Sequence, residues 1–456
     1  MEGRKIDYYI FRAYDVRGVF PKDIDADVAR RIGNAFAATF VKKECVVGMD
    51  GRLSGPELRE ALIMGITDAG MNVIDAGLCP RSACIFIARE RKLTSAYVTA
   101  SHLPKEWNGI KFADAEGIEL QEEENYRVRD VVLDGSYRKA AKPGRVVKAD
   151  ALCPYKRFLL SRLKRPAKPL KVAIDCGNGV GGLAAPELFR ELGFGVDALF
   201  ADVDGRFPNR PSEIDEKSLG GLKKRVGKAD IGIAYDGDAD RMVLMDEKGR
   251  MLGPETTSFI IMQELAGHEK GPIIANVECL RLMDEIGKRY GREVIRIRVG
   301  NSFMVQDVIR RKACFGVERS GHFCIPSIIP MDDGMAASMY AAYALSRSGK
   351  KLSEIVDSLP QYPFQRRKVD CPEPLKAKVI AGLKESLAKE GLKVNALDGV
   401  RVDFDHGWVL IRPSNTEAIM RLSVEAEDDA ELKALTARFL AMLKSEIASL
   451  GEKASD

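Results

Sequence analysis

Short apolar segments alternate with amphipathic segments through most of the chain. Cys45–Asp50 and Ser95–Thr99 are apolar runs of strand length, and Gly55–Ala69 between them carries Leu58 and Leu62 at helical spacing. Alternating strands and helices are typical of α/β domains, in which the sheets are mainly parallel. The pattern therefore predicts an α/β architecture for the first part of the chain.

The same pattern restarts twice and then changes. Lys171–Asp175 begins a second unit after a basic, proline-interrupted connection at 143–169, and a third unit begins near Glu255. Beyond Pro363, the helix predicted at Leu375–Glu390 leads into strands with an antiparallel pattern. We expect three similar α/β domains with mixed, mainly parallel sheets, followed by a smaller C-terminal α+β domain. The expected boundaries are 1–150, 151–254, 255–366 and 367–456.

Charge and hydropathy restrict the possible partners. The 71 Lys and Arg against 67 Asp and Glu give a net charge of +4, which over 456 residues is too small to indicate a nucleic acid or an anionic membrane. The longest weakly polar stretch, Gly334–Leu345, is short and holds two Tyr, so it predicts a buried helix and not a membrane span. Binding of small anions through local clusters stays open.

Cysteine usage indicates a reducing compartment. The nine Cys are odd in number, scattered and contain no CxxC pair, which argues against a disulfide framework and a cysteine-rich zinc site. The first residues contain no apolar signal-peptide core. We expect a cytoplasmic protein, a monomer or a small homo-oligomer, with no nucleic-acid or membrane partner.

The segment Thr99–Lys111 follows a predicted strand and carries reactive groups. Ser101 stands next to His102 at the carboxyl end of that strand, where α/β sheets place their ligands. Its hydroxyl is suited to act as a nucleophile or phosphoryl carrier, and Lys111 is suited to transfer a proton or bind phosphate. The alternative is a polar βα loop in which Ser101 only caps.

Three carboxylates alternate in the segment after another predicted strand. Asp236, Asp238 and Asp240 would repel one another without a cation, and ligands that offer only oxygen favour Mg²⁺, Mn²⁺ or Ca²⁺. An EF-hand loop is a poor match because Arg241 occupies the position at which that loop needs Gly. The remaining alternative is a solvated acidic turn.

Two later segments offer groups for polar ligands. Glu318 and Ser320 are suited to sugar hydroxyls, and His322 can titrate near neutrality. Arg412–Glu417 combines a guanidinium, hydroxyls, an amide and backbone N–H groups, as a phosphate-binding loop requires. An ordinary polar loop and a hydrogen-bonded β-turn are the respective alternatives. The nearby Asp332–Gly334 is expected only to cap the next helix.

Five segments in chain order together resemble the motifs of the α-D-phosphohexomutase superfamily, of the phosphomannomutase/phosphoglucomutase type. They are FRAYDVRG at 11–18, TASH…NGIK at 99–111, DGDADR at 236–241, GVERSGH at 316–322 and RPSNTE at 412–417. The resemblance implies four domains around a central cleft. It also implies an enzyme that moves a phosphoryl group between C1 and C6 of mannose or glucose phosphate, through a phosphoserine and a hexose 1,6-bisphosphate intermediate.

The resemblance assigns a role to each candidate residue. The implied catalytic residues are Ser101, which carries the phosphoryl group, Lys111, His322, Arg17 and His102. The implied Mg²⁺ ligands are Ser101, Asp236, Asp238 and Asp240. The implied substrate-binding residues are Glu318 and Ser320 for the sugar hydroxyls, Arg412, Ser414, Asn415 and Thr416 for the non-reacting phosphate, and Arg241.

Departures from the family pattern leave the sugar open. Leu103 stands where Asn is usual, Arg210 where His is common, Ala418 where Pro is frequent, and Gly77–Arg81 lacks the usual Thr-Pro. None of these changes removes a chemical group assigned above. Glucosamine phosphate is the alternative substrate. A metal-dependent phosphohydrolase with a phosphoserine intermediate and a non-catalytic Ca²⁺-binding or scaffold protein are alternatives from other classes.

Overall fold

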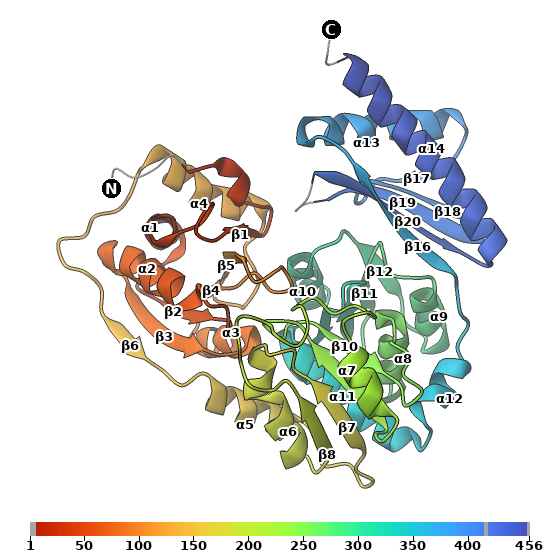
Figure 1. Ribbon diagram of the computed structural model, residues 1–456, viewed down its shortest axis with the longest axis horizontal. Coiled ribbons are helices and arrows are strands. Elements are labelled where there is room, and N and C mark those ends of the chain that lie inside the picture. The colour runs from red at the N-terminus through yellow and green to blue at the C-terminus, as the bar shows by residue number, and fades with distance from the viewer. Residues whose placement is uncertain (1–5, 415–417, 454–456) are drawn as a thin grey trace.

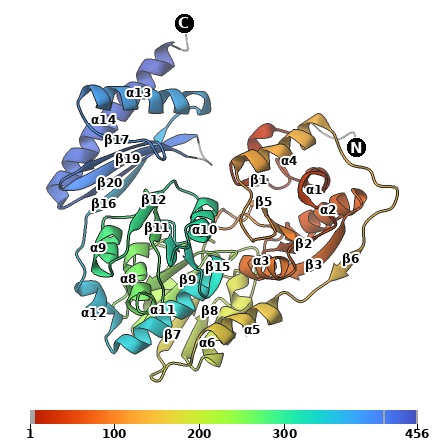
Figure 2. The same cartoon turned by 180° about the vertical axis from the view of Figure 1, so that it is seen from behind.

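Four β-sheets follow one another along the chain, each covered by its own helices (Figure 1). The computed structural model describes residues 6–414 and 418–453. Figures 1 and 2 show the first domain (red to orange) beside the second (yellow-green) and the third (green to cyan), with the fourth (blue) standing on the third. The predicted fold class, three α/β domains and a smaller α+β domain, is confirmed.

The first sheet has the order β1-β5-β4-β2-β3-β6 and mixes parallel with antiparallel pairs. Its strands are β1 (Asp15–Val19), β2 (Glu44–Met49), β3 (Asn72–Leu78), β4 (Thr94–Val98), β5 (Trp107–Ala113) and β6 (Val146–Lys148). Its helices are α1 (Ala26–Phe40), α2 (Gly55–Asp68), α3 (Arg81–Glu90) and α4 (Glu122–Asp134). Helices α1 and α2 pack so closely that a Cβ atom at Gly65 would lie 1.8 Å from the carbonyl oxygen of Arg30. The close approach therefore depends on glycine at this position.

The second and third sheets are also mixed, with the orders β10-β9-β7-β8 and β12-β11-β13-β14-β15. The second domain contains α5 (Leu152–Arg162), β7 (Lys171–Asp175), α6 (Ala185–Glu191), β8 (Gly195–Leu199), α7 (Gly220–Val226), β9 (Ile231–Tyr235) and β10 (Met242–Met245). The third contains α8 (Pro254–Leu265), β11 (Ile273–Asn276), α9 (Leu282–Arg289), β12 (Val294–Ile297), α10 (Asn301–Arg310), β13 (Phe315–Val317), β14 (Phe323–Ile325), β15 (Ile329–Asp332), α11 (Gly334–Ser348) and α12 (Leu352–Asp357). One continuous hydrophobic core joins these two domains to α3 of the first, and α11 is buried in it as predicted.

The fourth sheet is antiparallel throughout, in the order β16-β20-β19-β18-β17. Its elements are β16 (Phe364–Asp370), α13 (Lys376–Lys389), β17 (Val394–Asn395), β18 (Val400–Phe404), β19 (Gly407–Pro413), β20 (Ile419–Ala426) and α14 (Asp429–Lys453). Short 3₁₀ helices elsewhere in the chain lie at Tyr8–Ile10, Val180–Leu183 and Glu373–Leu375. The fourth domain has its own core, which includes Val379, Leu422 and Phe439. The predicted change from α/β to α+β after the third unit is therefore correct.

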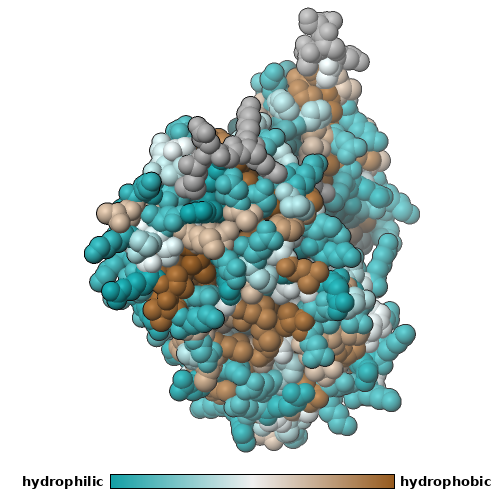
Figure 3. Space-filling view, turned by 60° about the vertical axis from the view of Figure 1, so that its left-hand side comes forward, coloured by the Kyte–Doolittle hydropathy of each residue, from teal (hydrophilic) through white to brown (hydrophobic). Residues whose placement is uncertain are grey.

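The surface and the cysteines agree with ordinary globular packing. No helix of the described residues is long and apolar enough to cross a bilayer. The face turned forward in Figure 3 is mainly hydrophilic and carries only separate hydrophobic patches. All nine cysteines are free thiols, and only Cys153 is exposed.

We predict that Tyr155→Phe weakens the contact between the second and third domains and lowers the free energy of unfolding. The buried hydroxyl of Tyr155 donates 2.7 Å to Asp333, which caps α11. Burial raises the pKa of Asp333 to about 6, so the acceptor is charged at pH 8. Losing a hydrogen bond to a charged group costs about 1.5–3 kcal/mol of unfolding free energy. Urea denaturation at pH 8 measures this loss; Tyr8→Phe, at a side chain that is 69% exposed, should change nothing.

Candidate active site

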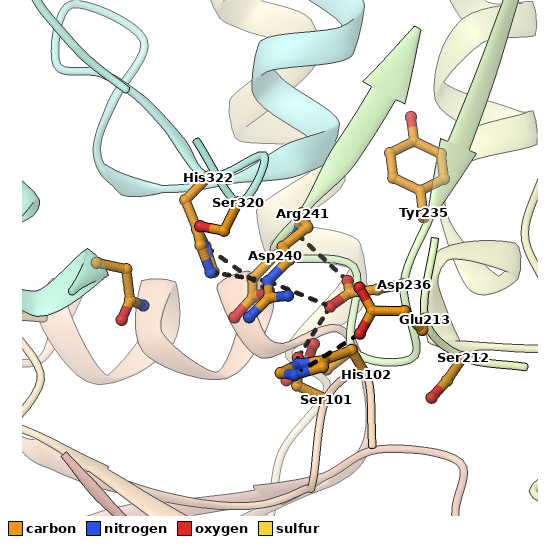
Figure 4. A network of polar contacts seen from close by, with 12 residues as sticks. Ser101, His102, Ser212, Glu213, Tyr235, Asp236, Asp240, Arg241, Ser320 and His322 are labelled. Atoms are coloured by element: carbon orange, nitrogen blue, oxygen red, sulfur yellow. Dashed lines mark hydrogen bonds and ion pairs between the residues drawn. The ribbon is translucent and has the colours of Figure 1, made fainter. Parts of the chain in front are cut away.

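Ser101 lies at the end of β4 and points at the loop between β9 and β10 of the second domain (Figure 4). The residue is buried and has a φ of 50°, a left-handed conformation that is uncommon outside glycine. Its backbone N–H donates 2.7 Å to Thr99 Oγ1, and its hydroxyl donates 2.9 Å to Asp236 Oδ2. The hydroxyl is thereby aimed at the acidic loop.

The acidic loop places Asp236, Asp238 and Asp240 together, with ligand atoms within 4.8 Å of one another. All three side chains are buried, and Asp238 Oδ1 and both carboxylate oxygens of Asp240 lack a hydrogen-bond partner among the described residues. Burial, and then the neighbouring carboxylates, raise the pKa of Asp236 well above its usual value and that of Asp238 to about 6. Carboxylate oxygens that accept no hydrogen bond, with no nitrogen or sulfur among them, fit a hard divalent cation. The cluster is thus able to hold a metal.

Two cationic side chains of the first domain lie beside Asp240. Lys111 Nζ on β5 lies 3.5 Å from Asp240 Oδ2, and Arg81 at the start of α3 lies 3.3 Å from the same oxygen. Burial alone would raise the pKa of Asp240, but its cationic neighbours lower it to about 2. Burial would lower the pKa of Lys111, but Glu119, which it contacts at 3.2 Å, raises it overall. Lys111 therefore carries its charge at neutral pH.

The structure corrects the predicted surroundings of Lys111. From the sequence no strand is expected between Thr99 and Lys111, and a βα loop is the alternative, but Trp107–Ala113 forms β5, antiparallel to β4. The strand begins with Trp107, Asn108 and Gly109, which do not show the alternation of apolar and polar residues typical of a strand. The local sequence pattern therefore did not predict it. Pairing with β1 and β4 on both sides places it in the sheet. A strand positions Lys111 more rigidly than a loop would.

His322 is held between the third domain and the acidic loop. Its Nδ1 lies 2.9 Å from Asp332 Oδ2, and its Nε2 lies 2.9 Å from Arg241 Nε (Figure 4). The prediction that Asp332 only caps a helix is wrong. Asp333 alone caps α11, and Asp332, the preceding residue on β15, directs its side chain to the opposite face of the strand.

His102 lies beside Ser101, and the charge of Arg17 acts on His102. His102 Nδ1 lies 3.3 Å from Ser101 Oγ, and its Nε2 lies 3.7 Å from Glu213. Burial, and then Arg241 and further cations, lower the pKa of His102 well below its usual value, so this imidazole is neutral at pH 7. Arg17 on β1 pairs with Asp15 at 2.6 Å, while its NH1 is buried without a hydrogen-bond partner among residues 6–414 and 418–453.

The remaining candidates lie on the third and fourth domains. Glu318 accepts hydrogen bonds from Asn276 Nδ2 at 3.0 Å and Gly300 N at 2.7 Å, and Ser320 Oγ lies 3.4 Å from its other oxygen. Arg412, on β19 and not in a loop, is buried against Glu278 at 3.3 Å. The buried Ser414 pairs through its backbone N–H with Ile419, while Asn415 and Thr416 lie outside the described residues.

Sequence reasoning missed four charged residues of this site. They are Arg81, Glu119, Asp332 and Glu278. Arg81 and Glu278 contact residues of other domains. Glu119 and Asp332 contact Lys111 and His322 of their own domains, each across a chain reversal that no local spacing marks. The available signal was indirect: Arg81 starts a helix whose other residues are mostly apolar, which makes a buried arginine at that point unusual.

Comparisons with known proteins agree with this architecture. Four family models match in order: the α/β/α domains I, II and III of phosphoglucomutase/phosphomannomutase at 9–139, 154–249 and 254–362, and its C-terminal domain at 368–442. A probable phosphoglucosamine mutase of Methanopyrus kandleri is 33% identical over 95% of this chain and 97% of its own. A phosphoglucomutase/phosphomannomutase of Thermococcus kodakarensis is 34% identical over 93% and 96%.

A solved structure matches the whole domain arrangement. A phosphoglucomutase/phosphomannomutase family protein from Burkholderia thailandensis superposes with a TM-score of 0.88 at 30% identity, over 97% of this chain and 98% of that one. Fold and site together define a phosphohexomutase, an isomerase that moves a phosphoryl group within a sugar phosphate. The chain belongs to the phosphoglucomutase/phosphomannomutase family, which confirms the resemblance seen in its motifs.

We predict that Glu278→Gln binds inorganic phosphate more tightly than the wild type. Burial alone would raise the pKa of Glu278, but Arg412 and Arg366 hold it below its usual value, so its negative charge competes with anions for Arg412. Replacing the charged contact by a neutral one should make the free energy of phosphate binding more favourable by about 1 kcal/mol, which is about a fivefold higher affinity. Isothermal titration calorimetry measures the change.

Glu390→Gln is the control, because Glu390 pairs with Arg438 at the surface of the same domain as Arg412. This control should bind phosphate like the wild type. Weaker binding by Glu278→Gln would contradict the competition and show that Glu278 instead orients Arg412.

Proposed function

We propose that the protein interconverts the 1- and 6-phosphates of mannose or glucose, with Ser101 as the phosphoryl carrier. The observation that carries this proposal is the Ser101 hydroxyl of the first domain, 2.9 Å from a buried carboxylate cluster of the second. A hydroxyl in that position can take and return a phosphoryl group next to a metal. Mg²⁺, held by Asp236, Asp238, Asp240 and an oxygen of Ser101, would supply positive charge for the transferring group.

The reaction proceeds by two transfers that mirror each other. The bond between Ser101 Oγ and phosphorus breaks, and the free sugar hydroxyl forms the new bond and loses its proton, giving a hexose 1,6-bisphosphate. The bisphosphate turns over and returns its other phosphoryl group to Ser101. Lys111 and Arg17 stabilise the negative charge, since Lys111 stays protonated and a buried N–H of Arg17 has no partner among the described residues.

Proton transfer falls to His322 in this proposal. Asp332 holds one ring nitrogen of His322 at 2.9 Å and thereby fixes the ring beside the acidic loop. His102, kept neutral, assists by hydrogen bonding at Ser101 Oγ. Arg241 lies 3.9 Å from Asp236 and can follow the charge as the phosphoryl group moves.

Substrate binding uses groups from the third and fourth domains. Glu318 and Ser320 accept and donate hydrogen bonds to the sugar hydroxyls, and Arg241 contributes from the acidic loop. Arg412, Ser414, Asn415 and Thr416 hold the phosphate that does not react. Because the bisphosphate must present either end to Ser101, one phosphate site has to accept both.

The identity of the sugar is the open part of the proposal. Relatives at similar identity are named for glucosamine and for glucose or mannose phosphates, so phosphoglucosamine is the second candidate. Rates with the 1-phosphates of mannose, glucose and glucosamine, each with a trace of its 1,6-bisphosphate, decide between them.

We further propose that the protein is a cytoplasmic monomer or small homo-oligomer, and that its domain boundaries fall after residues 150, 254 and 366.

We predict that Ser101→Ala abolishes mutase turnover without unfolding the protein. Intact-mass measurement of the wild type incubated with hexose 1,6-bisphosphate should show an added mass of about 80 Da, one phosphoryl group, and the variant should show none. Ser136→Ala, at an exposed serine of the same domain, should keep both the label and the activity. Wild-type turnover in Ser101→Ala would end the assignment. Release of inorganic phosphate as the main product would instead favour the phosphohydrolase.

We predict that EDTA silences the protein and that Mg²⁺ restores it. Asp238→Asn removes one charge from the cluster and should lower kcat roughly 100-fold or more, as loss of a charge-stabilising group does. Asp202→Asn, at an exposed carboxylate of the same domain, is the matched control and should retain normal kcat. Full activity in EDTA would contradict the metal role.

A further inference from the structure

We propose that Arg52 is the positioning residue of the phosphoryl-carrying loop, fixing the residues from Ser101 to Trp107 through their backbone carbonyls. Arg52 lies between β2 and α2 in the first domain and is 1% exposed. It contacts neither the acidic cluster nor the sugar-binding residues. This inference rests on the proposed role of Ser101 as phosphoryl carrier, and it assigns a function to a residue outside every recognised motif.

All five N–H groups of the Arg52 guanidinium are used. Nε donates to Asp50 Oδ2 at 3.1 Å. The carbonyl oxygens that accept from NH1 and NH2 are Pro104 at 2.7 Å, Trp107 at 2.9 Å, Ser101 at 2.8 Å and Leu103 at 2.7 Å. Four backbone carbonyls of one loop therefore converge on a single planar cation. A planar fork of five fixed donors can do this, whereas the three-donor ammonium of lysine cannot.

The loop needs this restraint because its own conformation is unfavourable. Ser101 has a φ of 50°, which costs energy in any residue other than glycine. Its carbonyl accepts a buried hydrogen bond from Arg52. Without Arg52 this carbonyl and that of Leu103 would lose a charged donor. The loop would then relax and move the Ser101 hydroxyl.

The hydrogen bonds of Arg52 to the loop and to Asp50, here called the clamp, connect through Thr99 to the acidic loop at 236–240. Asp50 accepts from both Arg52 and Thr99, whose hydroxyl also lies 3.1 Å from Asp238 Oδ2. The same Thr99 hydroxyl accepts the backbone N–H of Ser101 at 2.7 Å. Arg52 therefore holds the carbonyl of Ser101 and, through Asp50 and Thr99, its N–H.

The loop also borders open space. A cavity of about 580 Å³ is lined by 102–106 and 206–213. Across it the second domain reaches the loop through Ser212, which donates 3.0 Å to the Leu103 carbonyl, and Phe207, whose ring lies 5.4 Å from the Arg52 guanidinium. The cavity leaves the loop room to move, so its position depends on the contacts that Arg52 and Ser212 make with its carbonyls.

Displacement of the loop would change the chemistry in a recognisable way. Transfer to a sugar hydroxyl needs the phosphorus within about 3–3.5 Å of the attacking oxygen, and a shift of about 1 Å can cost about 100-fold in rate. Transfer to water is less demanding, because water is small and not held by the sugar site. A loosened loop should therefore lose transfer to sugar faster than it loses hydrolysis.

The test compares Arg52→Lys with the wild type after loading Ser101 with ³²P from labelled hexose bisphosphate. We expect kcat to fall about 30- to 100-fold with KM within about threefold, and the ratio of label released as phosphate to label passed to sugar to rise at least tenfold. Arg296→Lys is the matched control, because Arg296 also binds carbonyl oxygens, those of Asn276 and Cys279, far from Ser101 in the chain. This control should keep the wild-type ratio.

A second variant covers the case in which Arg52→Lys does not fold. Asp50→Asn keeps the shape of the clamp and removes its charge, and it should shift the same ratio in the same direction by a smaller factor. An unchanged ratio in the folded variants, with only a lower melting temperature, would overturn the inference and leave Arg52 a structural residue. Failure of the wild type to take up label would instead overturn the proposed role of Ser101, so the two failures are distinct.

Discussion

The burial of three carboxylates in one loop is the constraint on which the rest of this structure depends. The loop brings one carboxylate oxygen from each of Asp236, Asp238 and Asp240 within 4.8 Å of the others, and all three side chains are almost completely excluded from solvent. Like charges at this distance in a low-dielectric surrounding repel strongly. Lys111, Arg81 and the neighbouring polar groups compensate Asp240, yet the pKa values of Asp236 and Asp238 remain raised. A divalent cation bound there would supply the missing charge.

The compensating charges also join the domains. Arg81 of the first domain contacts Asp240 of the second and Asp332 of the third, so one guanidinium joins three domains. The fourth domain has its own core and meets the third through other groups, among them Glu278 with Arg412 and Glu425 with the backbone of Arg281. Ser101 and the acidic loop thus lie on domains that this guanidinium joins, while Arg412 stands on a domain with its own core.

Sequence alone predicted much of the fold and the centre of the site. Strands such as Lys171–Asp175 and Ile231–Tyr235 coincide with β7 and β9, because a buried apolar run between turns has few alternatives. The alternation of carboxylates in one loop likewise predicted their cluster. Strand β5 and the partners Arg81, Asp332 and Glu278 were not predictable in this way. Their positions depend on pairings between distant segments, which no local spacing records.

Direct observation of the cation tests the central claim most closely. A crystal of the protein soaked in Mn²⁺, a hard divalent ion visible by anomalous scattering, should show one strong peak at the loop between β9 and β10. The account predicts that one oxygen from each of Asp236, Asp238 and Asp240, together with an oxygen of Ser101 or its phosphoryl group, lies about 2.0–2.2 Å from that peak. Absence of a peak there at saturating Mn²⁺ would contradict the account, because the buried carboxylates would then be stable without a metal.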